Sequence, residues 1–299
     1  MIVATATDAN YVELTGVLLA SLAHHARGDI EKTYVFADRL SAHEKQQLQT
    51  SYGSDNLEII DLTESDLLTL AGLPSHRRLS RTGYARLLMP AKLGDAHQRL
   101  LYIDCDCVIN GPLTPLVDLS LEGHVLAAVA DNLTSLKESQ AARNRLIGLP
   151  EDTRYFNSGV LLIDLDRWRA EDVSERVRAF RMEHPELQTL DQDSLNGTLK
   201  GEWLELSDVW NMHRRLFHGQ YRDPLEVWQG ARILHFTGQA KPNYKDCTHP
   251  AQAIFLAHRA RTPWADAPLK SFLGRKISLK LQKLHRSFSS LKRRLIVWQ

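Results

Sequence analysis

The chain has 299 residues, of which 43% are hydrophobic, and its formal net charge at neutral pH is +1. This length accommodates one large α/β domain with an appendage, and the composition is ordinary for a globular protein. The basic residues are unevenly distributed, because residues 270–299 hold nine Lys or Arg and no Asp or Glu, leaving 28 basic against 36 acidic residues elsewhere. Basicity is therefore a property of the tail. This argues against nucleic-acid binding, for which basic residues interleaved with aromatic ones are typical.

Cysteine usage and the N-terminus favour a cytoplasmic protein. The three cysteines include no CxxC pair, so the sequence provides no disulfide or zinc framework and fits a reducing compartment. Residues 1–8 lack the basic segment and long apolar core of a secretory signal. Apolar runs also stay below the roughly 18 residues needed to span a bilayer.

Short apolar runs alternate along the chain with segments of helical periodicity. We expect strands at residues 2–7, 33–37, 57–62, 100–104, 125–130, 160–163 and 232–236, and helices at 11–25, 41–52, 170–183 and 191–200. Ser41 and Glu44 have the spacing of a capping box at the start of the second helix. This alternation predicts an α/β fold with a mostly parallel central sheet covered by helices.

The most informative segment is 100–108, where an apolar run ends in two carboxylates one residue apart, Asp104 and Asp106. An unpartnered buried carboxylate is costly, and the carboxyl ends of parallel strands open into the ligand crevice. We therefore interpret the pair as ligands of a hard divalent cation that holds a phosphate, as in a nucleotide-sugar site. The same spacing recurs at 164–166 and 191–193, so context decides, and turn-capping aspartates are the alternative.

Phosphate recognition by a glycine-rich loop is not indicated, because neither GxGxxG nor GxxxxGK[ST] occurs. The metal therefore has to take that role. The first strand ends in polar groups and an aromatic residue that suit uracil. Asp8 is placed to accept a hydrogen bond from an imide N–H, Asn10 to bond a ribose and Tyr11 to stack on a base. Alternatively, Asp8 or Asn10 caps the following helix.

Six motifs in a fixed order carry a family resemblance. They are Ala6-x-Asp8-x-Asn10-Tyr11, Tyr84-Ala85-Arg86-Leu87, Tyr102-Ile103-Asp104-Cys105-Asp106, Phe156-Asn157-Ser158-Gly159-Val160-Leu161-Leu162, Asp191-Gln192-Asp193-x-x-Asn196 and His235-Phe236-x-Gly238-x-x-Lys241-Pro242. Over residues 1–250 the chain resembles glycosyltransferase family 8, especially the bacterial α-galactosyl- and α-glucosyltransferases that build lipopolysaccharide. The resemblance implies a GT-A fold, in which a single Rossmann-like nucleotide-binding unit is fused to an acceptor-binding half.

The resemblance also implies Mn²⁺ as the cofactor, with Mg²⁺ as the alternative ion, and UDP-galactose or UDP-glucose as the donor. It assigns Asp104, Asp106 and His235 as metal ligands. A histidine nitrogen beside carboxylates favours manganese over calcium. Taken alone, His235 is more typical of a core or surface residue.

Donor-binding residues follow from the same resemblance and from the strand ends. We expect this role for Ala6, Asp8, Asn10, Tyr11, Arg86, Asp104, Cys105, Asp131, Gly238 and Lys241. Gly238 would let the backbone approach the pyrophosphate closely, and Lys241 would place a positive charge on it. Metal and lysine would then both stabilise the departing UDP. By itself, Lys241 would be interpreted as a solvated surface residue.

Four residues match family positions around the transferred hexose and are the expected catalytic residues: Arg86, Asn157, Asp191 and Gln192. The alternatives are an Arg86 paired with an acid on a helix surface, an Asn157 that forms a turn before Gly159, and an Asp191 that caps a helix. Gln192 is a poor nucleophile. We therefore expect front-face substitution, with the acceptor hydroxyl attacking on the side from which UDP leaves, in place of the double displacement of two-carboxylate glycosidases.

The basic tail carries an apolar stripe at steps of four and three residues. The stripe consists of Ile277, Leu281, Leu284, Phe288, Leu291 and Leu295. Such a helix, with Lys and Arg over most of its remaining surface, is typical of an anionic membrane interface. A helix docked on the domain or a coiled-coil pair are the alternatives. We divide the chain into a catalytic domain, 1–265, and a membrane-associating tail, 266–299, and expect the protein on the inner face of the cell membrane.

The sequence thus predicts a retaining hexosyltransferase that moves galactose or glucose from a UDP-sugar to a hydroxyl of a glycan. The expected acceptor is lipopolysaccharide, another cell-surface oligosaccharide or a lipid-linked glycan. Two alternatives are a non-catalytic module that binds a glycan or nucleotide-sugar, and a sugar-1-phosphate nucleotidyltransferase. The latter would normally have a glycine-rich loop near its N-terminus. The two donor epimers differ in one hydroxyl, so the sequence does not separate them.

Overall fold

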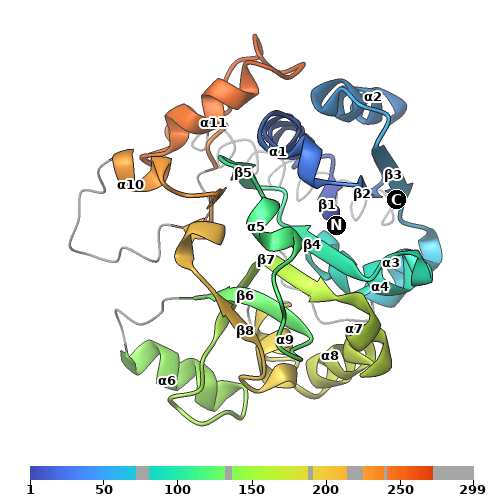
Figure 1. Ribbon diagram of the computed structural model, residues 1–299, viewed down its shortest axis with the longest axis vertical. Coiled ribbons are helices and arrows are strands. Elements are labelled where there is room, and N and C mark those ends of the chain that lie inside the picture. Colours follow the sequence, from blue (N-terminus) through green and yellow to red (C-terminus); the bar gives the residue numbers. More distant parts are fainter. Residues whose placement is uncertain (72–80, 132–136, 188–190, 214–224, 239–240, 272–299) are drawn as a thin grey trace, which may run out of the picture.

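A seven-stranded sheet forms the centre of the computed structural model, which describes residues 1–71, 81–131, 137–187, 191–213, 225–238 and 241–271. The strand order is β3–β2–β1–β4–β7–β6–β8, and all run parallel except β7, which is antiparallel to β4 and β6 (Figure 1). The strands are β1 (Ile2–Asp8), β2 (Lys32–Asp38), β3 (Leu57–Asp61), β4 (Arg99–Ile103), β6 (Leu126–Ala130), β7 (Phe156–Asp164) and β8 (Leu204–Leu206). The mostly parallel sheet is confirmed.

A second, smaller sheet has the order β5–β10–β9. It consists of β5 (Cys107–Ile109), β9 (Met212–His213) and β10 (Ile233–His235), with β10 antiparallel to β5 and parallel to β9. Only the last of these strands was expected from the sequence. The small sheet matters for function because it pairs the chain just after Asp106 with the chain just before Phe236.

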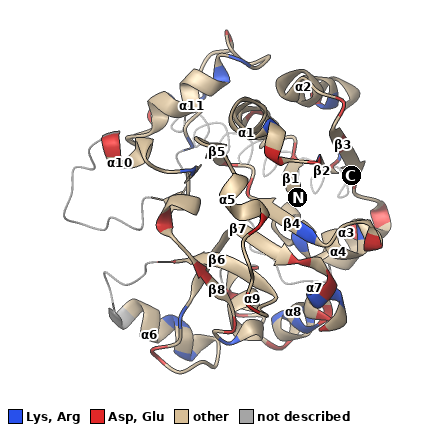
Figure 2. Ribbon diagram, viewed as in Figure 1, with Lys and Arg blue, Asp and Glu red and all other residues tan. Residues whose placement is uncertain are grey.

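Helices cover both faces of the large sheet. They are α1 (Val12–His25), α2 (Ala42–Tyr52), α3 (Glu64–Ala71), α4 (Met89–Lys92), α5 (Thr114–Val117), α6 (Lys137–Leu146), α7 (Leu165–Ala170), α8 (Val173–Glu183), α9 (Gln192–Leu199), α10 (Leu225–Gln229) and α11 (Gln252–Arg259). Side chains of α1 and α2 pack on one face, and those of α3, α4, α7, α8 and α9 pack on the other. Lys or Arg and Asp or Glu are interspersed along the described elements (Figure 2).

Burial on both faces explains why the strands are continuous apolar runs. In β4, Leu100 and Tyr102 pack in the core on one side, and Leu101 and Ile103 pack in the core on the other side. All four side chains are at most 2% exposed. Full burial of a side chain of this size contributes about 1.5–3 kcal/mol. The next residue, Asp104, lies just beyond the strand, where the core ends.

The predicted helices are confirmed in position, with one correction. Ser41 and Glu44 form the expected capping box at α2. The helix expected over 170–183 is α8, which begins three residues later, at Val173, and α7, which precedes it, was not expected. Asp172 between them has a φ of +50°, a left-handed conformation that ends the regular helix. Strand β7 also begins four residues earlier than expected, at Phe156.

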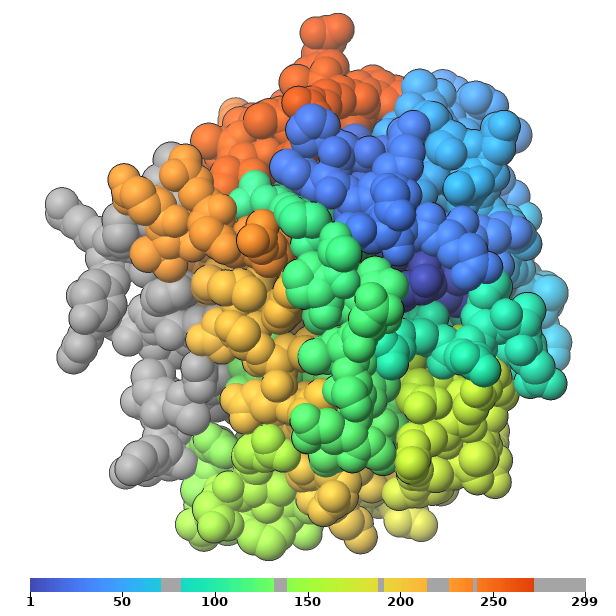
Figure 3. Space-filling view, in the orientation of Figure 1, coloured from blue at the N-terminus to red at the C-terminus, as the bar shows by residue number. Residues whose placement is uncertain are grey.

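The C-terminal part of the described chain is fixed to α1 (Figure 3). Glu13, in the first turn of α1, is 4% exposed and accepts hydrogen bonds from Arg259 Nε at 2.8 Å and Asn243 Nδ2 at 2.7 Å. The ring of Trp264 lies so close to Gly16 that a Cβ there would be 2.3 Å from Cζ3. These contacts hold the start of α1, and the polar segment that precedes it, in one place.

The tail expected at 266–299 lies mostly outside the described residues, which end at Ser271, and its whole apolar stripe lies outside them. The part that is described contacts the domain. The Nζ of Lys270 is 3.1 Å from the Glu13 carboxylate, and its backbone forms hydrogen bonds with Asn243 and Lys245. The domain boundary at 265 stays a prediction. Within the described residues, no helix combines the length and the apolar character that a membrane span requires.

The buried imidazole of His258 should make stability depend on pH. His258 is 6% exposed, and its ring centroid lies 5.2 Å from that of His25 and 5.9 Å from that of His24. Burial, together with His25 and Arg261, lowers the pKa of His258 to about 4. The unfolded chain takes up this proton at about pH 6.5, so the free energy of unfolding should decline as the pH falls from there towards the folded pKa.

Urea unfolding at a series of pH values checks this expectation. The decline in unfolding free energy should be shallower in His258→Gln than in the parent chain, because the variant has no imidazole to protonate at that position. Above the ordinary histidine pKa the two curves should run parallel. Equal slopes throughout the acid range would contradict the assignment.

Candidate active site

The Asp104-Cys105-Asp106 motif forms a tight turn between β4 and β5. The N–H of Cys107 donates to Asp104 O at 3.1 Å, and the N–H of Asp104 donates to Gly159 O on β7 at 2.7 Å. The N–H of Phe236 donates to Asp106 O at 3.0 Å, and this bond extends the pairing of β5 with β10. Sheet pairing therefore brings Asp106 and His235 together across more than a hundred residues of chain.

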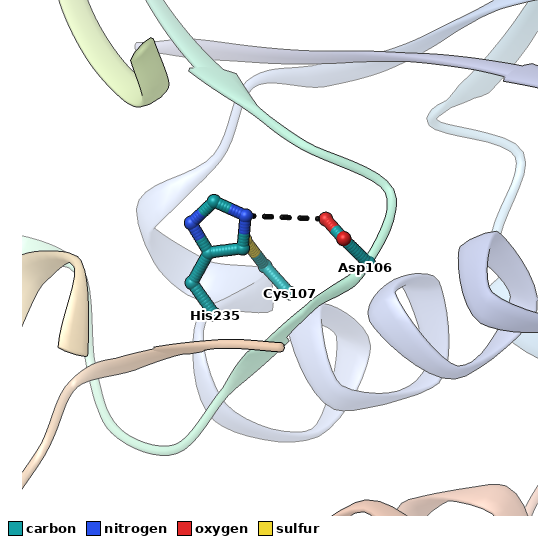
Figure 4. A group of neighbouring side chains, drawn as sticks. All are labelled: Asp106, Cys107 and His235. Carbon is teal, nitrogen blue, oxygen red and sulfur yellow. Dashed lines mark ion pairs between the residues drawn. The ribbon is translucent and has the colours of Figure 1, made fainter. Parts of the chain in front are cut away.

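The three expected metal ligands converge. Nε2 of His235 is 3.3 Å from Asp106 Oδ1 and 3.7 Å from Asp104 Oδ2. Two ligand atoms that are each bonded to one cation at about 2.1 Å, roughly at right angles, lie about 3 Å apart. Figure 4 shows the imidazole pointing towards the Asp106 carboxylate. Two carboxylates and an imidazole are a donor set that suits a divalent cation such as Mn²⁺.

Cys107 also lies beside this group, with its sulfur within 4.8 Å of the Asp106 and His235 ligand atoms. It is 1% exposed, and burial together with Asp106 and Asp104 raises the pKa of its thiol well above the usual range. Its side chain packs in the apolar core with Ile103 and Ile109. Cys107 thus contributes to the core behind the three expected ligands.

Each aspartate uses one oxygen within the protein and turns the other towards His235. Asp104 Oδ1 accepts from Tyr102 OH at 2.6 Å and from Arg86 Nη2 at 2.9 Å. Asp106 Oδ2 accepts from Lys241 Nζ, which also donates to Phe236 O at 2.8 Å. Burial would raise the pKa of Asp106, but Lys241 and His235 hold it well below its usual range. Asp106 is thus held as a carboxylate.

Arg86 is a buried cation, so the alternative of a helix-surface arginine is wrong. Its side chain is 3% exposed and lies between two acids, 2.9 Å from Asp104 Oδ1 and 3.0 Å from Asp191 Oδ2. Its guanidinium also lies over the ring of Tyr102, 4.2 Å from the centroid. Burial works against the charge, yet Asp191, Tyr102 and Asp104 raise the pKa of Arg86 overall. The fixed positive charge of Arg86 partly compensates the carboxylates of Asp104 and Asp191.

Asp191 and Gln192, at the start of α9, both form hydrogen bonds with Ser158, and Asp191 also contacts Arg86. Asp191 is at the N-cap position of α9, but its side chain forms no cap hydrogen bond and accepts from Ser158 Oγ at 2.9 Å. The carboxamide of Gln192 is fixed at both ends, since Nε2 donates to Asp131 Oδ2 at 2.7 Å and Oε1 accepts from the N–H of Ser158 at 3.2 Å. Burial raises the pKa of Asp191, with Arg86 opposing the increase.

Asn157 has a structural role that its motif did not reveal. Its Oδ1 accepts from the N–H of Gly159 at 3.0 Å and from Asn211 Nδ2 at 2.8 Å. The turn before Gly159 that was considered as an alternative is replaced by a strand bulge, at which the β6–β7 register shifts. Asn211 was not among the predicted site residues, because a polar residue between Trp210 and Met212 has no distinguishing pattern.

The expected nucleotide-binding residues lie at the carboxyl end of β1 and around Lys241. Asp8 Oδ1 accepts from the N–H of Asn10 at 2.8 Å, so Asp8 supports the turn before α1 without capping the helix itself. Burial raises the pKa of Tyr11, and the charge of Lys241 opposes the increase. Nearby, Ala6 lies buried in β1 and is 5% exposed.

Gly238 has a φ of +97°, a conformation that other residues rarely adopt, and a Cβ there would point into open space. This conformation accounts for a glycine at the position, whereas the reason given from the sequence was the close approach of the backbone to a pyrophosphate. Its proposed contact with a pyrophosphate is not shown by this geometry and stays a prediction.

A second Asp-x-Asp pair shows that this spacing alone does not identify a pair of metal ligands. Asp164 and Asp166 follow β7, but β7 is antiparallel, so this pair lies at the opposite edge of the sheet from Asp104. Asp164 caps α7 by accepting from the N–H of Arg167 at 2.9 Å, and Asp166 pairs with Arg169 at 2.9 Å. Equal spacing thus accompanies a helix cap and an ion pair in one place, and a convergence with His235 in the other. Strand direction decides between them.

Comparison with known proteins agrees with this geometry. The family model described as Glycosyl transferase family 8 matches residues 2–245, and the chain therefore belongs to this family. General stress protein A of Bacillus subtilis (strain 168) is 27% identical over 280 residues, which cover 88% of this chain and 94% of that protein. The lipopolysaccharide 1,2-glucosyltransferase of Escherichia coli (strain K12) is 29% identical over 275 residues, covering 88% and 79%.

Among solved structures, the galactosyltransferase LgtC in complex with donor and acceptor sugar analogues superposes with a TM-score of 0.75 at 27% identity, covering 89% of this chain and 99% of that chain. The fold is GT-A, as expected. Together, the family, its relatives and this structure identify the chain as a retaining glycosyltransferase of the hexosyltransferase type. They favour an enzyme over the binding module and the nucleotidyltransferase that the sequence left open.

Replacement of Arg86 tests the charge balance of the site. Arg86→Met leaves the carboxylates of Asp104 and Asp191 without their cation, and the free energy of unfolding should decrease by about 3–5 kcal/mol. Arg39→Met is the matched control, because Arg39 and its partner Glu64 are exposed and their pair contributes at most about 1 kcal/mol.

Urea denaturation measures both variants. Adding Asp191→Asn to Arg86→Met should recover part of the loss, since it removes one of the two uncompensated charges. If Arg86→Met costs no more than Arg39→Met, the central role of this cation is refuted.

Proposed function

We propose that this protein transfers galactose or glucose from a UDP-sugar, with Mn²⁺, to a hydroxyl of a glycan acceptor. The observation that carries the proposal is the convergence of Asp104, Asp106 and His235 at the carboxyl edge of the sheet, with Lys241 bound to Asp106. In a family of glycosyltransferases, this arrangement suits a donor whose leaving group is a diphosphate. A bound divalent cation would neutralise the charge that develops on that leaving group.

Residues of this chain account for the other requirements of the reaction. Lys241 places an ammonium group beside the metal ligands, where it would stabilise the same developing charge. Asp8, Asn10 and Tyr11 lie at the end of β1 and would hold the uridine. Gly238 would allow the pyrophosphate close to the backbone, as proposed from the sequence. Cys105 lies in the turn between Asp104 and Asp106 and would contact the donor there, as proposed from the sequence.

Retention of configuration is proposed to occur by front-face substitution. The carboxamide of Gln192, held between Asp131 and Ser158, would face the anomeric carbon without attacking it. The Asp191 carboxylate is bound to Arg86 and Ser158, and these contacts would make it a poor nucleophile. The acceptor hydroxyl would then pass its proton to a phosphate oxygen of the leaving UDP. A glycosyl-enzyme on Asp191 or Gln192, detected by intact-protein mass spectrometry, would refute this route.

The acceptor is proposed from the relatives. The Escherichia coli protein and a Salmonella typhimurium relative, 25% identical over 274 residues, are a lipopolysaccharide glucosyltransferase and a lipopolysaccharide galactosyltransferase. A cell-surface or lipid-linked oligosaccharide is the acceptor class that fits both. Peripheral membrane association through the basic tail belongs to the same proposal, and its support is the sequence pattern alone.

Release of UDP tests the proposed reaction. With UDP-galactose or UDP-glucose and Mn²⁺, the full-length protein should release UDP, and Asp106→Asn or Lys241→Gln should lower turnover by about 10²–10³-fold, because each removes a charge that acts on the leaving group. Asp166→Asn is the matched control, since it alters the equally spaced pair at the other edge of the sheet and should leave turnover unchanged. Undiminished turnover in the presence of excess chelator would contradict the metal requirement.

Liposome flotation tests the tail. A chain ending at Ser271 keeps the Lys270 contacts with Glu13 and should fold normally, but it should bind anionic liposomes far more weakly than the full chain. Raised salt should weaken binding of the full chain as well. Equal flotation of the two proteins would eliminate the tail as the membrane anchor.

A further inference from the structure

Asn211 is a fully buried asparagine in contact with His235. It lies between the short helical turn at Asp208–Trp210 and strand β9, and it is 0% exposed. Its Oδ1 is 2.9 Å from Nδ1 of His235, and its Nδ2 is 2.8 Å from Oδ1 of Asn157. Neither the charge balance of the site nor the proposed transfer reaction uses this residue.

The hydrogen-bond chain fixes the orientation of every amide in it. The N–H of Gly159 is a backbone donor, so the atom of Asn157 that it meets at 3.0 Å must be the oxygen. That oxygen can only accept, and therefore Asn211 turns its NH₂ group towards it. The remaining end of the Asn211 amide is an oxygen, which in turn requires a donor from His235.

The proton of the neutral imidazole is thereby assigned to Nδ1. Nε2 then carries the lone pair, and it is this nitrogen that lies 3.3 Å from Asp106 Oδ1 and 3.7 Å from Asp104 Oδ2. A histidine in this tautomer is ready to bind a cation through Nε2. An imidazole without such a partner is free to place its proton on either nitrogen.

The imidazole of His235 packs directly against Gly159. A Cβ at this position would lie 2.2 Å from Cε1 and 2.6 Å from Nδ1 of His235, so only glycine leaves room for the imidazole. The carbonyl of Gly159 also accepts the N–H of Asp104 at 2.7 Å. One short piece of β7, residues 157–159, thus supports the histidine and one of the aspartates together.

We propose that Asn211 is a positioning residue that keeps His235 in its Nδ1–H tautomer, with Nε2 directed at the cation. The inference rests on the proposed function for the presence of that cation. Partners behind a ligating histidine orient the ring and typically contribute about 10–100-fold to metal affinity. Asn157 belongs to the same chain of hydrogen bonds, whatever contact it also makes with the donor sugar.

Two measurements on three variants test the proposal. The imidazole ¹⁵N shifts of the metal-free protein report the tautomer, with the His235 signals identified by their loss in His235→Gln. Electron paramagnetic resonance of free Mn²⁺ reports the Kd for Mn²⁺ in the presence of UDP. The variants are Asn211→Leu, which removes both hydrogen bonds, Asn211→Asp, which keeps an acceptor facing Nδ1, and Gly159→Ala, which displaces the ring.

Asn211→Leu should move the His235 shifts away from the Nδ1–H pattern and weaken Mn²⁺ binding by about 10–100-fold. Asn211→Asp should keep the Nδ1–H pattern and lie between the parent chain and Asn211→Leu in affinity. Gly159→Ala should weaken Mn²⁺ binding as well, whereas Gly28→Ala, at a position with open space around it, should not.

Asn144→Leu is the matched control for loss of a buried asparagine. Asn144 is also 0% exposed. Its amide donates to Glu151 O and Thr153 O, and neither bond involves His235 or its partners. It should lower stability without changing the tautomer or the Kd. If Asn211→Leu matches this control in both measurements, the positioning role is refuted. If Asn211→Leu does not fold, the other two variants decide. An unchanged tautomer and Kd in Gly159→Ala, together with an altered tautomer in Asn211→Asp, would then refute the positioning role.

The two proposals fail in different ways. If the parent chain with UDP does not bind Mn²⁺, the proposed function loses its metal, and the ¹⁵N shifts still decide whether Asn211 sets the tautomer. If the parent chain binds Mn²⁺ and Asp106→Asn abolishes binding, but Asn211→Leu leaves both the shifts and the Kd unchanged, only the inference about Asn211 is refuted.

Discussion

The structure depends on compensation of the carboxylates that gather at the carboxyl edge of the central sheet. Asp104, Asp106 and Asp191 are drawn together there, and the cost of removing these charges from water is met by Arg86, Lys241 and hydrogen bonds from Tyr102 and Ser158. Arg86 lies between two of the acids and is buried with them. The other oxygens of Asp104 and Asp106 face the imidazole of His235, where a cation would complete the compensation.

Sheet topology explains how distant segments meet at this edge. Asp104 lies just after the end of β4, and Asp106 lies in the turn that follows. The antiparallel pairing of β5 with β10 places His235 opposite Cys107. Strand β7 runs against its neighbours, so its beginning, residues 156–159, reaches the same edge, and its end does not. One reversed strand thereby supplies the support behind the ligands.

Part of this could be predicted from the sequence for a physical reason. A strand buried on both faces must be apolar throughout, so the abrupt change at Asp104 marked both the end of β4 and the start of the site. The encounter of Asp106 with His235 had no such local cause, because it depends on pairing between short strands far apart in the chain. The sequence pointed to it only through the resemblance to family 8, which the comparisons confirm.

Other features of the structure have no recognisable pattern in the neighbouring sequence. Asn211 is a single polar residue between two large apolar ones, and its importance arises only from its contact with His235 and Asn157. Helix α7 was not expected, and the start of α8 was placed three residues too early, because the left-handed Asp172 between the two helices is not visible in a pattern of apolar residues. Asn157 and Asp191 each form hydrogen bonds within the protein at the edge of the site, and their roles towards the transferred hexose stay predictions.

A crystal of the full chain grown with Mn²⁺ and UDP, with the ion located by its anomalous scattering, tests the central claim most directly. We expect one strong peak within bonding distance of Asp104 Oδ2, Asp106 Oδ1 and His235 Nε2, next to the diphosphate. A well-ordered diphosphate without a peak at that position, or a manganese ion bound elsewhere with these three side chains apart, would contradict it.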